Sequence, residues 1–355
     1  MRILDILSAF PALLPLVNAQ GEFNFPCAPL TIQRSDPIVN PGAPGGHTHA
    51  IIGGSAFSRS MSNEAAPNAR DTTCAIEIDR SNYWQPQLYH IRSDGQFETV
   101  QFQGSVKPSA SIPLLLAPST AAYYLNRVCD YAPGKTSCAR GEYPRAPPAG
   151  LRILAGDPFL RSYNDTFEMR AMSHVCLAAS GPSSETHALP TRPCARIRAQ
   201  SFFPSCWDGV NLDSPNHKSH MSYPAIGDYN TGVCPQSHPI AIISIFLEFF
   251  YDTARYSDWE NLVYAMGDRT GYGLHADFVN GWTDINALGN AFRTCSGGDL
   301  TLNSPGCSIT KGKLIPAGPK NLEVPAPQED LGLQAPLRAL PGNNPVTGNP
   351  SDRVN

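Results

Sequence analysis

The apolar residues of this chain occur in short runs, and few of them repeat with the spacing of a helix. Residues 241–251 are β-branched and aromatic on both faces, which predicts a strand buried at the centre of a sheet. Residues 151–155 and 87–92 predict two shorter strands bounded by proline or glycine. Helical spacing is clear at 284–293, where Thr283 is the predicted N-cap. We therefore expect a mainly β chain, a jelly-roll-like antiparallel β-sandwich with long disulfide-stapled loops and few short helices.

The two ends of the chain differ in composition from its middle. An arginine, an apolar stretch and small residues before a cleavage point after Ala19 are typical of a secretory signal peptide. No later run approaches the ~20 apolar residues of a membrane span. The C-terminal segment is rich in Pro, Gly and Asn, so we expect it to be disordered. The predicted segments are a signal peptide (1–19), an extended segment (20–34), a single domain (35–312) and a disordered tail (313–355).

Composition narrows the class of protein. Charged residues make up 16% of the 355 and the net charge is −4, so the chain lacks the basic field that nucleic-acid binding needs. All ten cysteines follow the predicted cleavage point, and an even number in an exported chain predicts disulfides. Asn164 begins a glycosylation sequon, which is usable if the chain is exported. Two close pairs, Cys129/Cys138 and Cys295/Cys307, would staple loops, and a Cys206–Cys234 bond would hold the loop 207–233. The other pairings stay open.

Histidines stand in turn-rich segments at several places along the chain. His47 and His49 form an H-x-H motif, and in an extended chain both imidazoles lie on one side. Neutral imidazoles in that arrangement suit a divalent metal ion, so the pair is a candidate metal site. The alternative is that each histidine bonds a loop carbonyl. We predict that six histidines converge on one concave site: His47, His49, His217, His220, His238 and His275.

The segment 204–224 collects titratable and aromatic residues among turn formers. Such residues on a loop held by a scaffold are a common way to build a site. The competing interpretation is that the aspartates are ordinary turn residues and the tryptophans belong to the core. Glu248 differs, because a carboxylate inside the central strand needs an ion pair or a shifted pKa. The predicted catalytic residues are His217, His220, His275, Tyr223, Asp208 and Asp277, and the predicted substrate-binding residues are Trp207, Trp282, Asp213, Asn280 and His238.

Several common active-site motifs are absent from the sequence. It has no G-x-S-x-G nucleophile elbow, no H-E-x-x-H zinc-protease motif and no G-x-x-x-x-G-K phosphate-binding loop. We therefore set aside the enzyme classes that depend on these three motifs.

Five motifs follow one another along the chain in an order that is specific. They are Asp36–Gly42 with His47–His49 and Gly53–Gly54, Ser81–Tyr89, Phe203–His220, Cys234–Pro239 and Gly271–Trp282. With these motifs the chain resembles the fungal secreted domain of unknown function DUF1996, over roughly residues 35–307. The resemblance implies an extracellular fungal protein and no particular activity. Members often carry additional cell-wall-sensing domains, for which we expect no room in this chain.

We expect the protein to act on a polysaccharide of a cell wall or plant tissue, by hydrolysis or β-elimination. In the elimination, His217, His220 or His275 removes a proton from an acidic sugar, Tyr223 protonates the leaving oxygen, and a cation or arginine neutralises the uronate. One alternative is a non-catalytic carbohydrate-binding or wall-structural protein, and another is a metal-assisted enzyme acting on a small metabolite. We expect a secreted monomer whose partner is polysaccharide or cell wall, with a divalent metal as the candidate cofactor.

Overall fold

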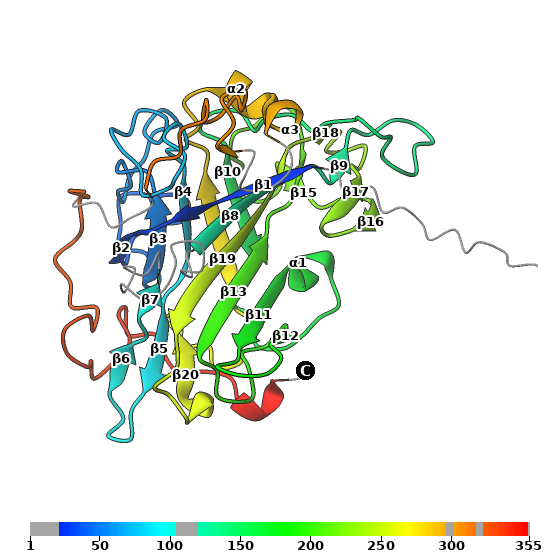
Figure 1. The fold of residues 1–355 in the computed structure, drawn as a ribbon. Helices are drawn as coiled ribbons and strands as arrows, with labels where there is room; N and C mark the ends of the chain where they lie inside the picture. Colours follow the sequence, from blue (N-terminus) through cyan, green and yellow to red (C-terminus); the bar gives the residue numbers. More distant parts are fainter. Residues whose placement is uncertain (1–20, 104–119, 296–301, 317–321, 354–355) are drawn as a thin grey trace, which may run out of the picture.

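The computed structural model describes residues 21–103, 120–295, 302–316 and 322–353. Two large antiparallel sheets form its body (Figure 1). The first sheet has the order β1 (Glu22–Cys27), β8 (Thr120–Leu125), β19 (Ser244–Asp252), β13 (Arg196–Phe202), β11 (Met172–Leu177) and β12 (Ser184–Thr186), with β7 (Phe102–Gln103) also paired to β19. The second has the order β10 (Arg152–Gly156), β21 (His275–Val279), β4 (Asn82–Pro86), β3 (His49–Gly53) and β2 (Pro29–Gln33).

Three smaller sheets and a few short helices complete the described part of the chain. The small sheets are β15 (Met221–Ser222), β14 (Cys206–Trp207) and β18 (Ile240–Ala241); β16 (Ile226–Asp228), β17 (Thr231–Val233) and β9 (Val128–Cys129); and β20 (Leu262–Tyr264), β5 (Leu88–Ile91) and β6 (Phe97–Thr99). The helices are α1 (Phe167–Arg170), α2 (Ile285–Gly289), α3 (Ala291–Thr294) and the 3₁₀ turns Trp259–Asn261 and Pro350–Asp352. The mainly β prediction is confirmed.

The main hydrophobic core lies between the two large sheets. Phe249 and Tyr251 of β19 belong to the same buried cluster as Ala276 and Phe278 of β21. Alternate residues of a strand point to opposite faces, so the even-numbered residues of β21 face the other sheet. The predicted strands at 241–251, 151–155 and 87–92 correspond to β18 and β19, β10, and β5. Strand β19 lies between β8 and β13, which confirms its predicted central place.

A separate apolar cluster covers the outer face of the second sheet. It contains Trp84, Ile51 and Val279 from three neighbouring strands, together with Ile38 and Phe57 from the segment between β2 and β4. The odd-numbered residues of β3 and β21 therefore face away from the main core. This outer face is where the histidines of β3 and β21 lie.

The predicted helix is interrupted, and its N-cap lies one residue later than predicted. Asp284, not Thr283, caps α2, because its carboxylate accepts a hydrogen bond from the backbone N–H of Ala287 at 2.8 Å. The helix breaks at Asn290, and α3 begins at Ala291.

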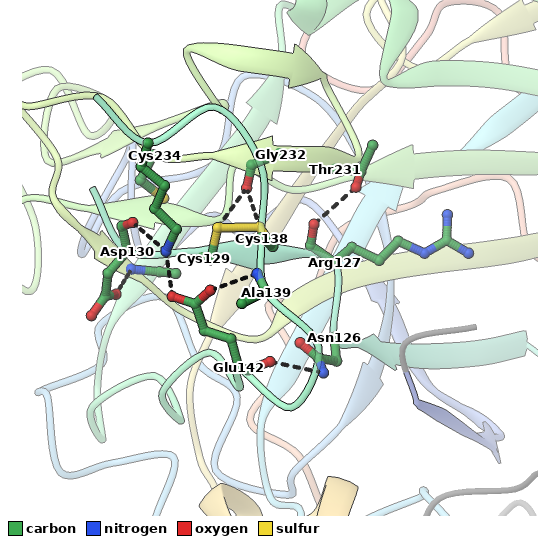
Figure 2. The surroundings of a disulfide bond; sticks show 12 residues. Asn126, Arg127, Cys129, Asp130, Cys138, Ala139, Glu142, Thr231, Gly232 and Cys234 are labelled. Atoms are coloured by element: carbon green, nitrogen blue, oxygen red, sulfur yellow. Dashed lines mark hydrogen bonds and ion pairs between the residues drawn. A yellow bond between two sulfur atoms is a disulfide. The ribbon is translucent and has the colours of Figure 1, made fainter. Parts of the chain in front are cut away.

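Five disulfides join all ten cysteines. Figure 2 shows the Cys129–Cys138 bond, with the Gly232 carbonyl oxygen 3.7 and 3.2 Å from its two sulfurs. That bond therefore ties the loop after β9 back to β9, which pairs with the hairpin strand β17. The predicted pairs are all confirmed, and the two further bonds are Cys27–Cys74 and Cys176–Cys194.

The segment predicted to be a disordered tail packs against the domain over residues 322–353. Leu331 and Leu340 are buried, and the Arg353 guanidinium donates to four backbone carbonyls. The expectation of disorder is corrected for these residues. Composition counts the few apolar side chains but does not reveal the carbonyls that the rest of the fold offers to this segment.

At the other end, the extended segment predicted at 20–34 supplies β1 and β2, and so belongs to the sandwich. The predicted signal peptide lies outside the described residues. Within the described ranges, no helix has the length and apolar character that crossing a bilayer requires.

Candidate functional site

Strand register brings two distant histidines together on the outer face of the second sheet. His49 of β3 pairs with Pro86 of β4, and Asp277 of β21 pairs with Trp84. Continuing the second pairing by two residues places His275 opposite Pro86 as well. Both imidazoles therefore flank the same proline across the sheet, and His47 precedes β3 by two residues.

The three histidines form one cluster. A ring nitrogen from each lies within 4.8 Å of the others, and His47 Nε2 is 2.9 Å from His275 Nε2. The ring centroids of His47 and His49 are 4.4 Å apart. The predicted H-x-H pair thus gains His275 as a third member.

Backbone carbonyls orient two of these rings. His49 Nδ1 lies 3.1 Å from the Ser35 carbonyl oxygen, and His275 Nδ1 lies 2.8 Å from that of Gly273. Each Nδ1 therefore carries the proton and donates it, which leaves the lone pair on Nε2. The lone pair of His275 accepts from His47 Nε2 at 2.9 Å. His49 Nε2 is buried and has no hydrogen-bond partner within the described part of the chain. A carbonyl that fixes the far nitrogen is the usual second partner of a metal-binding histidine.

All three imidazoles are neutral. Burial lowers the pKa of His49 to about 3 and that of His275 to about 4. Burial, followed by electrostatic interaction with His49, His275 and Arg161, lowers the pKa of His47 well below its ordinary value. Neutral imidazole is the form that binds metal ions.

A cavity of about 220 Å³ opens beside the cluster. His47 and His275 form part of its wall. Its other polar lining residues are two carboxyls, two cations and two amides: Asp36, Asp277, Arg161, Lys218, Asn40 and Asn344.

The two carboxyls of the cavity are held differently. Asp277 follows His275 by two residues on one strand, so both side chains lie on the same face of β21. Its Oδ2 is buried without a hydrogen-bond partner among described residues, and burial raises the pKa of Asp277 well above its ordinary range. Asp36 accepts hydrogen bonds from the backbone N–H groups of Ile38 and Val39, each at 3.0 Å, and burial also raises its pKa.

Lys218 is the cation best placed to meet a ligand. Its ammonium donates to the Gly156 carbonyl at 2.7 Å and to Glu168 at 2.5 Å. An ammonium has three N–H donors, so one remains for the cavity. Lys218 follows His217, whose backbone adopts a positive φ of 57°.

The other three predicted histidines have hydrogen-bond partners outside this cluster. His217 Nδ1 lies 2.9 and 3.0 Å from the two carboxylate oxygens of Asp213, which also pairs with Arg152. Both ring nitrogens of His220 have partners, the Ser214 hydroxyl and the Arg152 carbonyl. His238 lies at the surface and bonds the Ser219 carbonyl. The predicted convergence of six histidines therefore holds for His47, His49 and His275.

Five other predicted site residues have structural partners away from the cavity. Trp282 is buried in the main core, and Asn280 donates to the Pro147 and Pro148 carbonyls. The Tyr223 hydroxyl donates to the Phe202 carbonyl at 2.9 Å, so it is not poised to protonate a leaving group. The remaining two are turn residues: the Trp207 indole donates to the Asn211 carbonyl, and Asp208 accepts from the N–H groups of Val210 and Asn211.

Glu248 forms an ion pair, as expected of a carboxylate inside the central strand. Its carboxylate lies 3.1 Å from Arg198 and accepts from the Tyr123 hydroxyl at 2.9 Å. Sequence reasoning did not single out Lys218, Arg161, Asp36 or Phe159 for the cavity. Lys218 could have been identified from its place beside His217 in the loop 204–224. Phe159 stands in a short turn-forming segment without any motif, so no sequence feature pointed to it.

Comparison with protein-family models finds one match, described as a domain of unknown function (DUF1996), over residues 36–282. Comparison with curated proteins and with solved structures finds no match. The matched region contains the three clustered histidines and most of the cavity wall.

Proposed function

Because the chain belongs to the DUF1996 family, whose domain has no known function, we propose a function from the site itself: a metal-dependent enzyme that acts on an anionic substrate. His47, His49 and His275 hold a divalent transition-metal ion in this proposal. The observation that carries it is His49 Nε2, a buried lone pair without a hydrogen-bond partner among the described residues, in a cluster with two other imidazoles. A buried polar atom left unpaired requires an explanation, and an ion supplies one.

The ligand set fits such an ion. Imidazole nitrogen suits zinc, copper, iron and nickel. Ligands about 2.0–2.1 Å from a tetrahedral zinc ion lie about 3.3 Å from one another. The 2.9 Å between the Nε2 atoms of His47 and His275 is close to that spacing. The carbonyls of Ser35 and Gly273 set the tautomer that metal binding needs.

The arrangement favours a catalytic site over a structural one. Structural zinc sites are closed by four protein ligands, whereas catalytic sites use three and leave a position for substrate or water. Among the described residues, no fourth His, Cys, Asp or Glu joins the cluster. The cavity lies beside the three histidines, so a substrate can reach the open position.

The chain's own residues supply binding and proton transfer. A bound ion would polarise an oxygen of the substrate. Asp277 lines the same cavity with an unpaired carboxyl oxygen, so we assign it to moving a proton to or from the substrate. Lys218 offers its remaining N–H to an anionic group. This differs from the scheme predicted from the sequence, in which His217, His220 or His275 was the base and Tyr223 the acid.

We also propose that the enzyme is exported. Five disulfides support this, because they form and persist in oxidising compartments. The sequon residue Asn164 lies in an exposed loop, as a glycosylated residue must.

Elemental analysis of protein purified without a histidine tag tests the proposal. We expect about one equivalent of a transition metal in the native protein, and a loss of most of it in His47→Ala and His275→Ala. His238→Ala is the matched control, because His238 lies at the surface and bonds a loop carbonyl. Native protein that holds less than about a tenth of an equivalent after incubation with zinc, copper, iron or nickel would reject the site.

A further inference from the structure

An exposed aromatic ring stands at the mouth of the cavity. Phe159 lines the cavity and is 85% exposed, the highest value among the exposed large apolar residues that the structure describes. Val39, which also lines the cavity, is 47% exposed. Single exposed apolar residues are common on protein surfaces. What distinguishes Phe159 is that it lines the same cavity as His47 and His275.

The turn that carries Phe159 is braced on both sides. The Phe159 backbone N–H donates to Asp157 Oδ1 at 2.8 Å. The Arg161 guanidinium donates from Nη1 to the carbonyls of Pro158 at 2.7 Å and Leu160 at 2.6 Å, the residues on either side of the phenylalanine. Arg161 is itself bonded to Thr347 and Met266. The turn is thus held before a ligand arrives, which lowers the entropy cost of binding.

We propose that Phe159 is a stacking platform for a sugar ring, and that the cavity takes one acidic sugar unit of a polysaccharide. This inference rests on the proposed function and names its substrate class. The flat face of a pyranose ring covers an aromatic ring, while its hydroxyls and carboxylate need polar partners. The cavity offers those partners in the Asn40 amide, the side-chain oxygen of Asn344 and the spare N–H of Lys218.

The lining fits an acidic sugar better than a lipid or an apolar peptide. Four ionisable side chains besides the histidines line a cavity of about 220 Å³, which is small beside the ~300–1,000 Å³ of sites for drug-sized ligands. An acyl chain would leave Asp277 Oδ2 and the spare N–H of Lys218 without partners, which is costly. A single sugar unit carries enough oxygens to satisfy them, and the exposed Phe159 lets the polymer continue outside.

Binding measurements on zinc-loaded and chelator-treated protein test the platform. The probes are polygalacturonate, an acidic polymer, and laminarin, a neutral one. We expect native protein to bind polygalacturonate more tightly than laminarin. Phe159→Ala should weaken polygalacturonate binding about tenfold in both metal states, which corresponds to about 1.4 kcal/mol and lies within the range of an aromatic contact. Phe159→Trp should restore it, and Lys218→Gln should weaken binding of the acidic polymer alone.

Leu333→Ala is the matched control, because Leu333 is 56% exposed and does not line the cavity. The platform is overturned if Phe159→Ala binds like native protein, if Leu333→Ala weakens binding equally, or if native protein binds neither polymer. A preference for laminarin would overturn the acidic-sugar assignment. Metal content, measured on the same samples, reports separately on the proposed function. An intact metal site with unaltered binding by Phe159→Ala would reject the platform alone.

Discussion

At the scale of single residues, the site depends on which ring nitrogen of each histidine is left free. Sequence spacing predicted that His47 and His49 share a side, and it singled out His275 as a catalytic base. It could not predict that all three meet, because that depends on the pairing of β3 and β21 with β4, and a one-residue slip would turn His275 to the other face. The hydrogen bonds from His49 and His275 to the carbonyls of Ser35 and Gly273 could not be predicted from the sequence either.

Replacing Asp277 separates metal binding from proton transfer. Asp277→Asn keeps the size of the side chain but cannot exchange a proton, so we expect unchanged metal content. Cleavage of the polysaccharide that native protein degrades should fall about 10²–10⁴-fold. Reducing ends and ultraviolet absorbance of unsaturated products are the measurements. Asp208→Asn, in a turn away from the cavity, is the control, and equal activity of the two variants would remove Asp277 from the mechanism.

A buried carboxyl in the core gives a pH-dependent contribution to stability. Asp79 accepts from the Tyr83 hydroxyl at 2.7 Å and the Ser81 N–H at 3.1 Å, and burial raises its pKa to about 6. Because this value exceeds that of the unfolded chain, the contribution is fully present below about pH 4 and is lost as the pH rises through 6.

We therefore expect native protein to gain up to about 3 kcal/mol from Asp79 between pH 7 and pH 4, relative to Asp79→Asn. Urea unfolding at intervals over that range measures the difference between the two proteins. A difference that stays constant with pH would show that Asp79 does not titrate as described.

At the scale of elements, the sequence predicted the strands with continuous apolar runs. Strand β19 is buried on both faces, which is why its pattern is unambiguous. The packing of residues 322–353 could not be predicted, because it depends on partners such as the Pro190 and Leu262 carbonyls, which are distant in sequence. The loop 207–233 was predicted correctly as one closed by Cys206 and Cys234.

Removing that disulfide should cost more than removing a shorter one. In the loop-entropy model the Cys206–Cys234 bond, with a sequence separation of 28, contributes about 3–4 kcal/mol. The Cys129–Cys138 bond, with a separation of 9, contributes about 2–3 kcal/mol. We expect Cys206→Ser/Cys234→Ser to lower the melting temperature more than Cys129→Ser/Cys138→Ser. It should also weaken polygalacturonate binding, since Lys218 lies in the loop. The reverse order in melting would contradict the model.

Arg353 should hold the C-terminal segment in place. Its guanidinium donates to the carbonyls of Arg269, Pro190, Trp259 and Leu262 at 2.7–3.2 Å. Arg353→Ala leaves buried carbonyls unpaired, and we expect a loss of about 3 kcal/mol in the free energy of unfolding. Arg338→Ala, at an exposed position, should change it little. Denaturant unfolding compares the two, and equal stability would show that this segment contributes little to the fold.

At the scale of the whole molecule, the sandwich was predictable and the location of the site was not. Short strands and scarce helical spacing indicate two antiparallel sheets. The histidines nevertheless lie on the outer face of the second sheet and not in the main core. Ile38 and Phe57, from the loops before and after β3, pack on that same face. Alternation along β3 and β21 is compatible with either face until the packing is known.

An ion held between β3 and β21 should stabilise the entire fold. A ligand at a hundred times its dissociation constant adds about 2.7 kcal/mol to the folded state, which corresponds to a rise in melting temperature of roughly 5–10 °C. We expect a chelator to lower the melting temperature of native protein by that amount and to leave His275→Ala unchanged. An equal chelator effect on both proteins would place the bound ion elsewhere.

The cavity wall is built from parts of the chain that emerge from the ribosome at different times. Asn344 lines the cavity and donates to the carbonyl of Gly46, beside His47, at 2.9 Å. Folding during synthesis proceeds from the N-terminus, so the three histidines are available before Asn344 has been made. For a period the nascent site is open on the side that Asn344 later covers. In the proposed metal enzyme, an ion could therefore enter from that side before the wall is complete.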